Sequence, residues 1–283
     1  MIESFVDSWA LFHEVYLAGW LIAALLALVG VVVVARDQIF LGAAIAQTSM
    51  LGITVGIRFG GALLGGAASG RAADLLHTAF GGAFAVGGAM LVATDDGRRG
   101  ESREALIGWL FLAGASLSVL TVAHSPHGLA EVQRLLASTI IGAARADVVL
   151  FASMLAVSIA TASRYRDTLV LLVTDAEMAR AVGVRVDTWN RILAVWLGLA
   201  IAVAIHVAGL AYTFGCLVLP ALAAKHLCRE VRYMLLAAPA IATAVTIVAF
   251  VVANHHDYPP GQLAVAMLAA VVAAAWMSRR ARS

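Results

Sequence analysis

Residues 15–35 read VYLAGWLIAALLALVGVVVVA, a run of 21 residues that contains no charged side chain. About 20 such residues in a helix cross the hydrocarbon core of a bilayer. The rest of the chain has the same character, because 62% of its 283 residues are hydrophobic and only 13% are charged. Soluble domains contain about 45–50% apolar and about 25% charged residues. The composition therefore indicates a membrane protein.

Eight further apolar runs follow the first. Lipid offers no hydrogen-bond partner to the backbone, so each span is a helix or part of a closed barrel, and the alternation typical of barrel strands is not seen. The sequence predicts an all-α polytopic membrane protein with about nine transmembrane helices. We expect an extracytoplasmic segment 1–14 without a cleavable signal peptide, a single transmembrane domain 15–277 and a tail 278–283. The further runs are 39–57, 75–93, 105–123, 148–163, 188–206, 210–227, 234–253 and 263–277.

The basic residues are unevenly distributed between the predicted loops. With nine spans, 15 of the 19 arginines and lysines fall on the side that carries the C-terminus. Arginine and lysine are enriched in the cytoplasmic loops of membrane proteins. We therefore expect the N-terminus outside and the C-terminus in the cytoplasm of a multi-pass protein of the bacterial plasma membrane.

Seven of the eight histidines fall at or beyond the outer ends of the predicted spans. Imidazole is the commonest side-chain ligand of first-row transition metals, which favours metal traffic on this side. The candidate metal ligands are the pairs His124 with His127 and His255 with His256, although neither pair completes a four-ligand zinc site. The alternative is that outer loops tolerate histidine without using it.

Motifs of several functional classes are absent. A phosphate-binding P-loop ends in Gly-Lys-Ser/Thr, whereas the only lysine, Lys225, follows Ala224. No acidic residue falls in the middle of a predicted span, which argues against a proton- or sodium-coupled carrier. The formal net charge of +2 is too small to indicate nucleic-acid binding. We therefore expect neither catalysis nor a cofactor in this chain itself.

Gln47, Thr48 and Ser49 form the one polar cluster that the sequence places at membrane depth. Amide and hydroxyl groups in lipid need partners or water. One interpretation is that the three side chains line a substrate path. The other is that they hold helices together, with the two hydroxyls bonded back to their own helix.

The segment 164–187 is the longest and most charged inner connection. Residues 174–186 read TDAEMARAVGVRV, in which Thr174 or Asp175 is a helix N-cap, Glu177 follows in the first turn and Gly183 ends the helix. The sequence thus predicts a short capped helix in the cytoplasm. Its small residues and charged flanks suit docking into a cleft on a partner, and a solvated connector is the alternative.

This segment resembles one in the membrane subunits of ATP-binding-cassette importers for zinc, manganese and iron. That family carries a D-x-x-x-A-x-x-x-G string, and Asp175, Ala179 and Gly183 occupy its positions here. The likeness extends from about Phe40 to Arg229. Further similar strings are Ile141-Gly142, Val207-Ala208-Gly209 and Leu217-Val218-Leu219-Pro220-Ala221.

The resemblance implies that 175–185 is a coupling helix that docks into an ATPase subunit. The partners it implies are a cytoplasmic ATP-binding subunit, a second permease subunit, identical or paralogous, and an extracytoplasmic metal-binding protein, all working in membrane lipid. ATP would then be hydrolysed on the partner, and the metal would be the transported substrate. The coupling residues implied are Asp175, Glu177, Ala179, Arg180 and Gly183.

The chain departs from the family near its second predicted span. The family usually reads G-D-A-L-[SA]-H-A-x-L-P-G, whereas residues 42–52 read GAAIAQTSMLG. The family's Asp and His lie four residues apart on one helix face, where they can hold a divalent ion. Ala43 and Gln47 replace them here, so the identity of the metal and its state, bare or chelated, stay open.

The function implied is that of a membrane permease subunit of an importer, which moves a divalent metal ion or metal complex into the cytoplasm by ATP-driven alternating access. Two alternatives belong to other classes. One is a secondary, ion-coupled transporter, and the other is a membrane assembly subunit that transports nothing.

Overall fold

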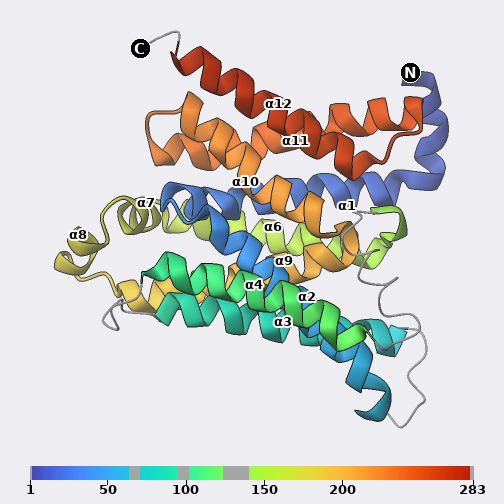
Figure 1. The fold of residues 1–283 in the computed structure, drawn as a ribbon. Coiled ribbons are helices and arrows are strands. Elements are labelled where there is room, and N and C mark those ends of the chain that lie inside the picture. Colours follow the sequence, from blue (N-terminus) through green and yellow to red (C-terminus); the bar gives the residue numbers. More distant parts are fainter. Residues whose placement is uncertain (1, 64–70, 95–101, 124–139, 281–283) are drawn as a thin grey trace. The chain divides into compact units, whose positions relative to one another are not determined.

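The computed structural model describes residues 2–63, 71–94, 102–123 and 140–280, and the regular elements within these ranges are all helical (Figure 1). Nine of the described helices are long and apolar enough to cross a membrane. Each overlaps one of the runs predicted from the sequence, so the prediction of an all-α protein with about nine spans is confirmed. The spans are Ser8–Ala35, Ile39–Phe59, Leu75–Thr94, Arg103–Val122, Arg145–Arg164, Val186–Ala208, Leu210–Leu227, Val231–His256 and Pro260–Arg280.

The full helices extend somewhat beyond these spans, and two short helices and one 3₁₀ turn lie between them. In chain order the elements are α1 (Ile2–Ala35), α2 (Ile39–Leu63), α3 (Arg71–Thr94), α4 (Arg103–Val122), η1 (Ile140–Gly142), α6 (Arg145–Arg164), α7 (Arg166–Thr174), α8 (Ala176–Ala181), α9 (Val186–Ala208), α10 (Leu210–Leu227), α11 (Val231–His256) and α12 (Pro260–Arg280).

The chain divides into two compact units. Unit 1 comprises Met1–Asp37, Ser138–Val184 and Val207–Ser283, and unit 2 comprises Gln38–Ala137 and Arg185–His206. Three of the chain crossings between the units lie at or near residues with positive φ, namely Asp37 (55°), Gly183 (86°) and Gly209 (77°). These residues interrupt the helical backbone, because a left-handed conformation cannot continue a right-handed helix.

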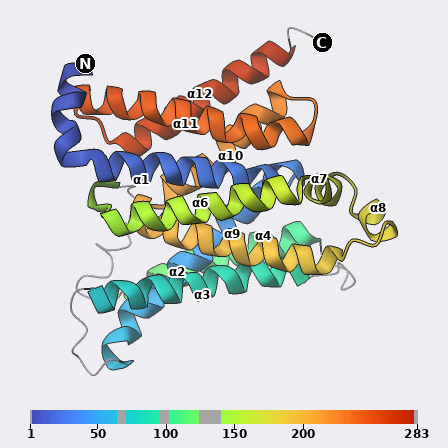
Figure 2. The same cartoon turned by 180° about the vertical axis from the view of Figure 1, so that it is seen from behind.

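Unit 1 is built around α1, which packs against α6, α10 and α11, while α12 packs against α10 and α11 (Figure 2). The core is apolar and includes the fully buried side chains of Ile22, Leu25 and Phe250. The Tyr212 side chain, which is fully buried in this core, is satisfied, since its hydroxyl donates a hydrogen bond of 2.9 Å to the carbonyl oxygen of Gly19. Unit 1 therefore has a core of its own.

Unit 2 is built around α2, which packs against α3 and α4. Glycines allow these helices to approach closely, as is common in membrane proteins. A Cβ built at Gly114 of α4 would lie 2.8 Å from the carbonyl carbon of Gln47, and one built at Gly198 of α9 would lie 2.9 Å from the backbone of Val86 in α3. The position of Gln47 is therefore determined by direct backbone contact with α4.

Candidate coupling helix and substrate-path residues

The predicted coupling segment forms two consecutive short helices, α7 and α8, after the span of α6. α7 is anchored in unit 1, because its Leu169 and Leu172 are buried and its Leu172 carbonyl accepts a hydrogen bond of 3.4 Å from Arg36 Nη2 at the end of α1. α8 extends from α7 at one end of unit 1 (Figure 1). The sequence prediction of a short helix in this segment is confirmed.

Asp175 is the N-cap of α8, one of the two residues that the sequence predicted for this position. Its Oδ1 atom accepts a hydrogen bond of 2.9 Å from the backbone N–H of Met178, which satisfies a free donor of the first turn. Gly183 follows the last turn with φ of 86°, and the N–H of Val184 donates to the carbonyl of Ala179 at 2.9 Å. This closing bond has the form of a Schellman motif, which explains why glycine stands at position 183.

The side chains of α8 divide into one buried and several exposed ones. Ala179 is fully buried, so it anchors the helix. Glu177 and Arg180 are exposed and provide one negative and one positive group on the surface of α8. Two apolar side chains are also exposed, Met178 by 52% and Val182 by 58%. The sequence did not indicate that these two form a pair. Exposed apolar side chains rimmed by charges are typical of an interaction surface.

Thr48 and Ser49 lie in the contact between α2 and α3. Both are buried, and Thr48 Oγ1 donates a hydrogen bond of 2.9 Å to the carbonyl of Ile45 in its own helix. Across the contact, a Cβ at Gly88 would lie 2.8 Å from Thr48 Oγ1, and one at Gly81 would lie 3.3 Å from Ser49 Oγ. The geometry of Thr48 matches the alternative that was left open, a hydroxyl bonded back to its own helix.

Gln47 differs from its two neighbours because it is only partly buried. Its amide can both donate and accept hydrogen bonds. Of the polar cluster, Gln47 therefore has the side chain best able to reach a solute, and its role in a substrate path stays a prediction.

The histidines that we expect on the outer side are described only in part. His124 and His127 lie outside the described residues. His255 and His256 end α11, are exposed, and have ring centroids 4.8 Å apart. Within the described ranges, no group of three or more His, Cys, Asp and Glu side chains is placed to hold a metal ion. The pair His255 and His256 thus stays a candidate for transient contact with a metal.

Several basic residues of unit 1 lie at the end where α1, α10 and α12 finish, among them Lys225 and Arg279. There Lys225 Nζ donates to the carbonyl of Val34 at 3.3 Å and to Asp37 Oδ1 at 2.5 Å, so it caps the C-terminus of α1. This capping role could not be predicted from the sequence, where Lys225 is only the single lysine of the chain. The available signal was its place in the last turn of a predicted span, where a basic side chain can reach the end of a neighbouring helix.

The comparison with known families identifies the chain. The profile of the ABC 3 transport family matches residues 8–279. The chain belongs to this family. The match includes α7, α8 and eight of the nine described spans in full, and all but the last residue of the ninth. It confirms the family resemblance that the coupling segment indicated.

Two solved structures share the fold of this ABC 3 family member. PsaBC from Streptococcus pneumoniae, in complex with a Fab, superposes with a TM-score of 0.78 at 16% sequence identity, over 98% of this chain and 95% of that one. A metal-chelate type ABC transporter in an inward-facing conformation superposes with a TM-score of 0.72 at 17% identity, over 94% of this chain and 87% of that one. No curated protein sequence matches the chain.

Proposed function

We propose that this chain is the membrane permease subunit of an ATP-driven importer, which moves a divalent metal ion or a metal complex into the cytoplasm. The observation that carries the proposal is α8, a capped and exposed helix held by α7 in a chain of the ABC 3 transport family. The chain has no P-loop, so ATP is hydrolysed on a separate subunit, and α8 is the element that contacts it. Asp175 and Gly183 define the ends of this contact, and Glu177, Arg180 and Met178 form its surface.

The structural relatives and the residue at position 47 support the proposed substrate class. One relative is described as a metal-chelate type transporter. Gln47 and Ala43 stand where the resembling family has a His and an Asp, and an amide binds bare Zn²⁺ or Mn²⁺ more weakly than an imidazole does. We infer that Gln47 contacts a hydrated ion or the polar groups of a chelate.

The proposed orientation places the basic end of unit 1 in the cytoplasm and the end with His255 and His256 outside. It is supported by the enrichment of arginine and lysine on cytoplasmic sides. Two permease subunits, each with one α8, then serve two ATPase subunits, and an extracytoplasmic binding protein delivers the metal to the outer end. Closure of the ATPases acts on α8 and α7, and the spans alternate between outward and inward access.

The test is reconstitution of the chain with a candidate ATP-binding subunit from the same genome. The two proteins are expected to co-purify, and vesicles containing both should accumulate a divalent metal, bare or chelated, only when ATP is present. A permease that takes up metal without the ATPase and responds to a proton or sodium gradient would instead be a secondary carrier. A stable complex that moves no metal in any form would contradict the transport proposal.

A further inference from the structure

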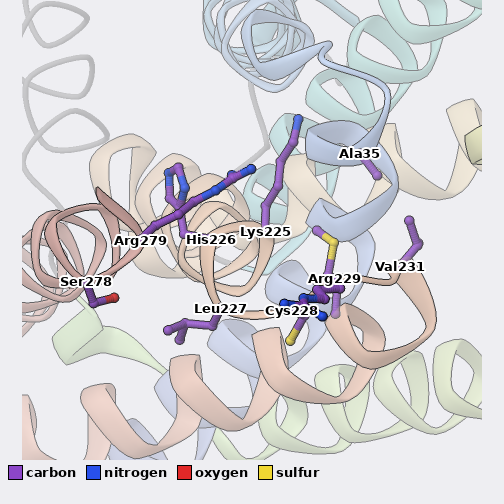
Figure 3. Close-up of a pocket in the computed structure, with 10 residues that line it drawn as sticks. Ala35, Lys225, His226, Leu227, Cys228, Arg229, Val231, Ser278 and Arg279 are labelled. Atoms are coloured by element: carbon purple, nitrogen blue, oxygen red, sulfur yellow. The ribbon is translucent and has the colours of Figure 1, made fainter. Parts of the chain in front are cut away.

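A cavity of about 550 Å³ lies in unit 1, where four membrane-spanning helices end or begin (Figure 3). α1 ends at Ala35, α10 ends at Leu227, α11 begins at Val231 and α12 ends at Arg280. The ends of spans mark the boundary between the hydrocarbon core and the polar headgroups. The cavity therefore lies at the depth of the lipid headgroups.

The charged groups around the cavity are almost all positive. Lys225, Arg229 and Arg279 line it, and none of its described lining residues carries a carboxylate. Asp37 is bonded to Lys225, while the nearby Glu230 is paired with Arg232. Arg229 and Arg279 form no ion pair with any residue in the described ranges. Within the described part of the chain, two guanidinium groups thus have no counter-ion, and guanidinium matches the geometry of a phosphate.

His226 adds an unsatisfied polar atom to the same place. Its Nδ1 atom is buried and has no hydrogen-bond partner among the described residues. The charges of Arg279 and Lys225 both act on its ring, and Figure 3 shows the His226 and Arg279 side chains next to each other in the cavity. Buried polar atoms without partners are rare in folded proteins. An anion between Arg279 and His226 would supply the missing acceptor, with the imidazole donating from Nδ1.

The surroundings favour a lipid over a soluble anion. Leu227 lines the cavity and is 53% exposed, and Met277, next to the lining residue Ser278, is 60% exposed. Trp276, also near the end of α12, is 45% exposed. Tryptophan side chains of this kind gather at membrane interfaces, with the apolar part toward the lipid. The cavity thus joins a cationic region to a surface suited to acyl chains.

We propose that this cavity binds the phosphate group of an anionic phospholipid. Arg229 and Arg279 contact the phosphate oxygens, His226 donates a hydrogen bond, and the acyl chains lie along Leu227 and Met277. Basic pockets between membrane helices bind anionic headgroups by the same charge attraction and hydrogen bonds. The site is independent of the transported substrate, so it stands or falls separately from the proposed function.

The test uses the purified full-length chain in a neutral detergent. Thermal unfolding and native mass spectrometry are followed while phosphatidylglycerol, phosphatidylcholine or inorganic phosphate is added. We expect phosphatidylglycerol to raise the unfolding midpoint more than phosphatidylcholine, and to stay bound in native spectra. Arg229→Gln and Arg279→Gln should each weaken its apparent affinity about fivefold.

Arg280→Gln is the matched control, because it removes the same charge one residue further along α12 but outside the cavity. It should change the affinity less than twofold. An equal loss of affinity in Arg280→Gln would mean that the lipid responds to the general positive charge, and it would overturn the proposed site. Equal shifts of the unfolding midpoint with phosphatidylglycerol and phosphatidylcholine would overturn it as well. If inorganic phosphate raises the unfolding midpoint as much as phosphatidylglycerol does, the cavity binds a soluble anion, and the proposal of a lipid is wrong. If Arg279→Gln does not fold, Arg229→Gln and the native spectra of the unchanged protein still decide.

Discussion

At Gly30, the backbones of α1 and α10 approach each other directly. A Cβ built on this glycine would lie 1.8 Å from the carbonyl oxygen of Leu217, which belongs to a helical backbone and cannot rotate away. Small residues at such contacts allow helices to pack in lipid, where no hydrophobic force drives helix association. Gly30 therefore sets the distance between two central helices of unit 1.

Gly30→Ala should lower the stability of the folded protein by about 1–3 kcal/mol or more, because it overpacks a backbone contact. Gly87→Ala on α3 is the control, since no atom lies within 4 Å of a Cβ at that position. The measurement is thermal unfolding of both purified variants in detergent. Equal midpoints for the two variants would contradict the close approach of α1 and α10.

Gln47→Leu should reduce uptake per folded molecule strongly, because leucine removes the amide that we propose contacts the substrate. Thr48→Val is the control in the next residue, and its loss of one hydroxyl bonded to its own helix should leave uptake unchanged. Uptake is measured in vesicles and normalised to folded protein. If Gln47→Leu changes only stability, by about 0.6–2 kcal/mol, the side chain holds helices together and lies outside the substrate path.

At the scale of elements, the two ends of α8 separate it from the neighbouring helices. Asp175 caps its first turn directly after the end of α7, and Gly183 ends it in a left-handed conformation that few other residues adopt. The space beside Gly183 is open, since no atom of the described residues, apart from its chain neighbours, lies within 4 Å of a Cβ there. Glycine is therefore needed at this position for its backbone conformation, and a larger side chain would have room.

Gly183→Leu should abolish both metal uptake and substrate-stimulated ATP hydrolysis, because a left-handed leucine costs about 1–2 kcal/mol and the end of α8 would rearrange. Gly183→Asn is the matched control, since asparagine tolerates this conformation, and it should retain most activity. Both activities are measured in the reconstituted complex, with membrane insertion checked by expression level. Normal transport by Gly183→Leu would return the segment to the role of a connector.

At the scale of the molecule, the two ends of unit 1 differ in character. One end collects Arg36, Lys225 and Arg279. At the other end, the Tyr16 hydroxyl donates a hydrogen bond of 3.1 Å to Asn254 Oδ1, which joins α1 to α11 near His255 and His256. Since α1 and α11 run the length of the unit, this polarity defines two membrane surfaces.

A cysteine at position 258, Tyr258→Cys, should react with an impermeant thiol reagent in intact cells, whereas Glu177→Cys should react only after lysis. Cys216 and Cys228 are first replaced by serine or alanine. Both test positions are exposed in the structure, so shielding at either one reflects the membrane and not burial. The reverse pattern of labelling would invert the proposed orientation of the whole chain.

Much of the architecture could be predicted because local sequence determines it. An uncharged run such as 15–35 can satisfy its backbone in lipid only as a helix, so each span could be read without knowledge of its neighbours. The same holds for α8, since the cap at Asp175 and the stop at Gly183 are formed within a few residues. Thr48 was harder to interpret, because its hydroxyl has the same chemistry in a path as in a helix contact.

The sequence by itself determined that there are about nine spans, their helical state, the position of α8 and the uneven distribution of basic residues. These properties depend on groups that are close along the chain. Only the tertiary structure decided which helices meet at Gly30, that Thr48 faces α3, and that Arg229, Arg279 and His226 share one cavity. Those residues lie in different helices or loops, and their proximity results from packing between segments far apart in sequence, which no local pattern encodes.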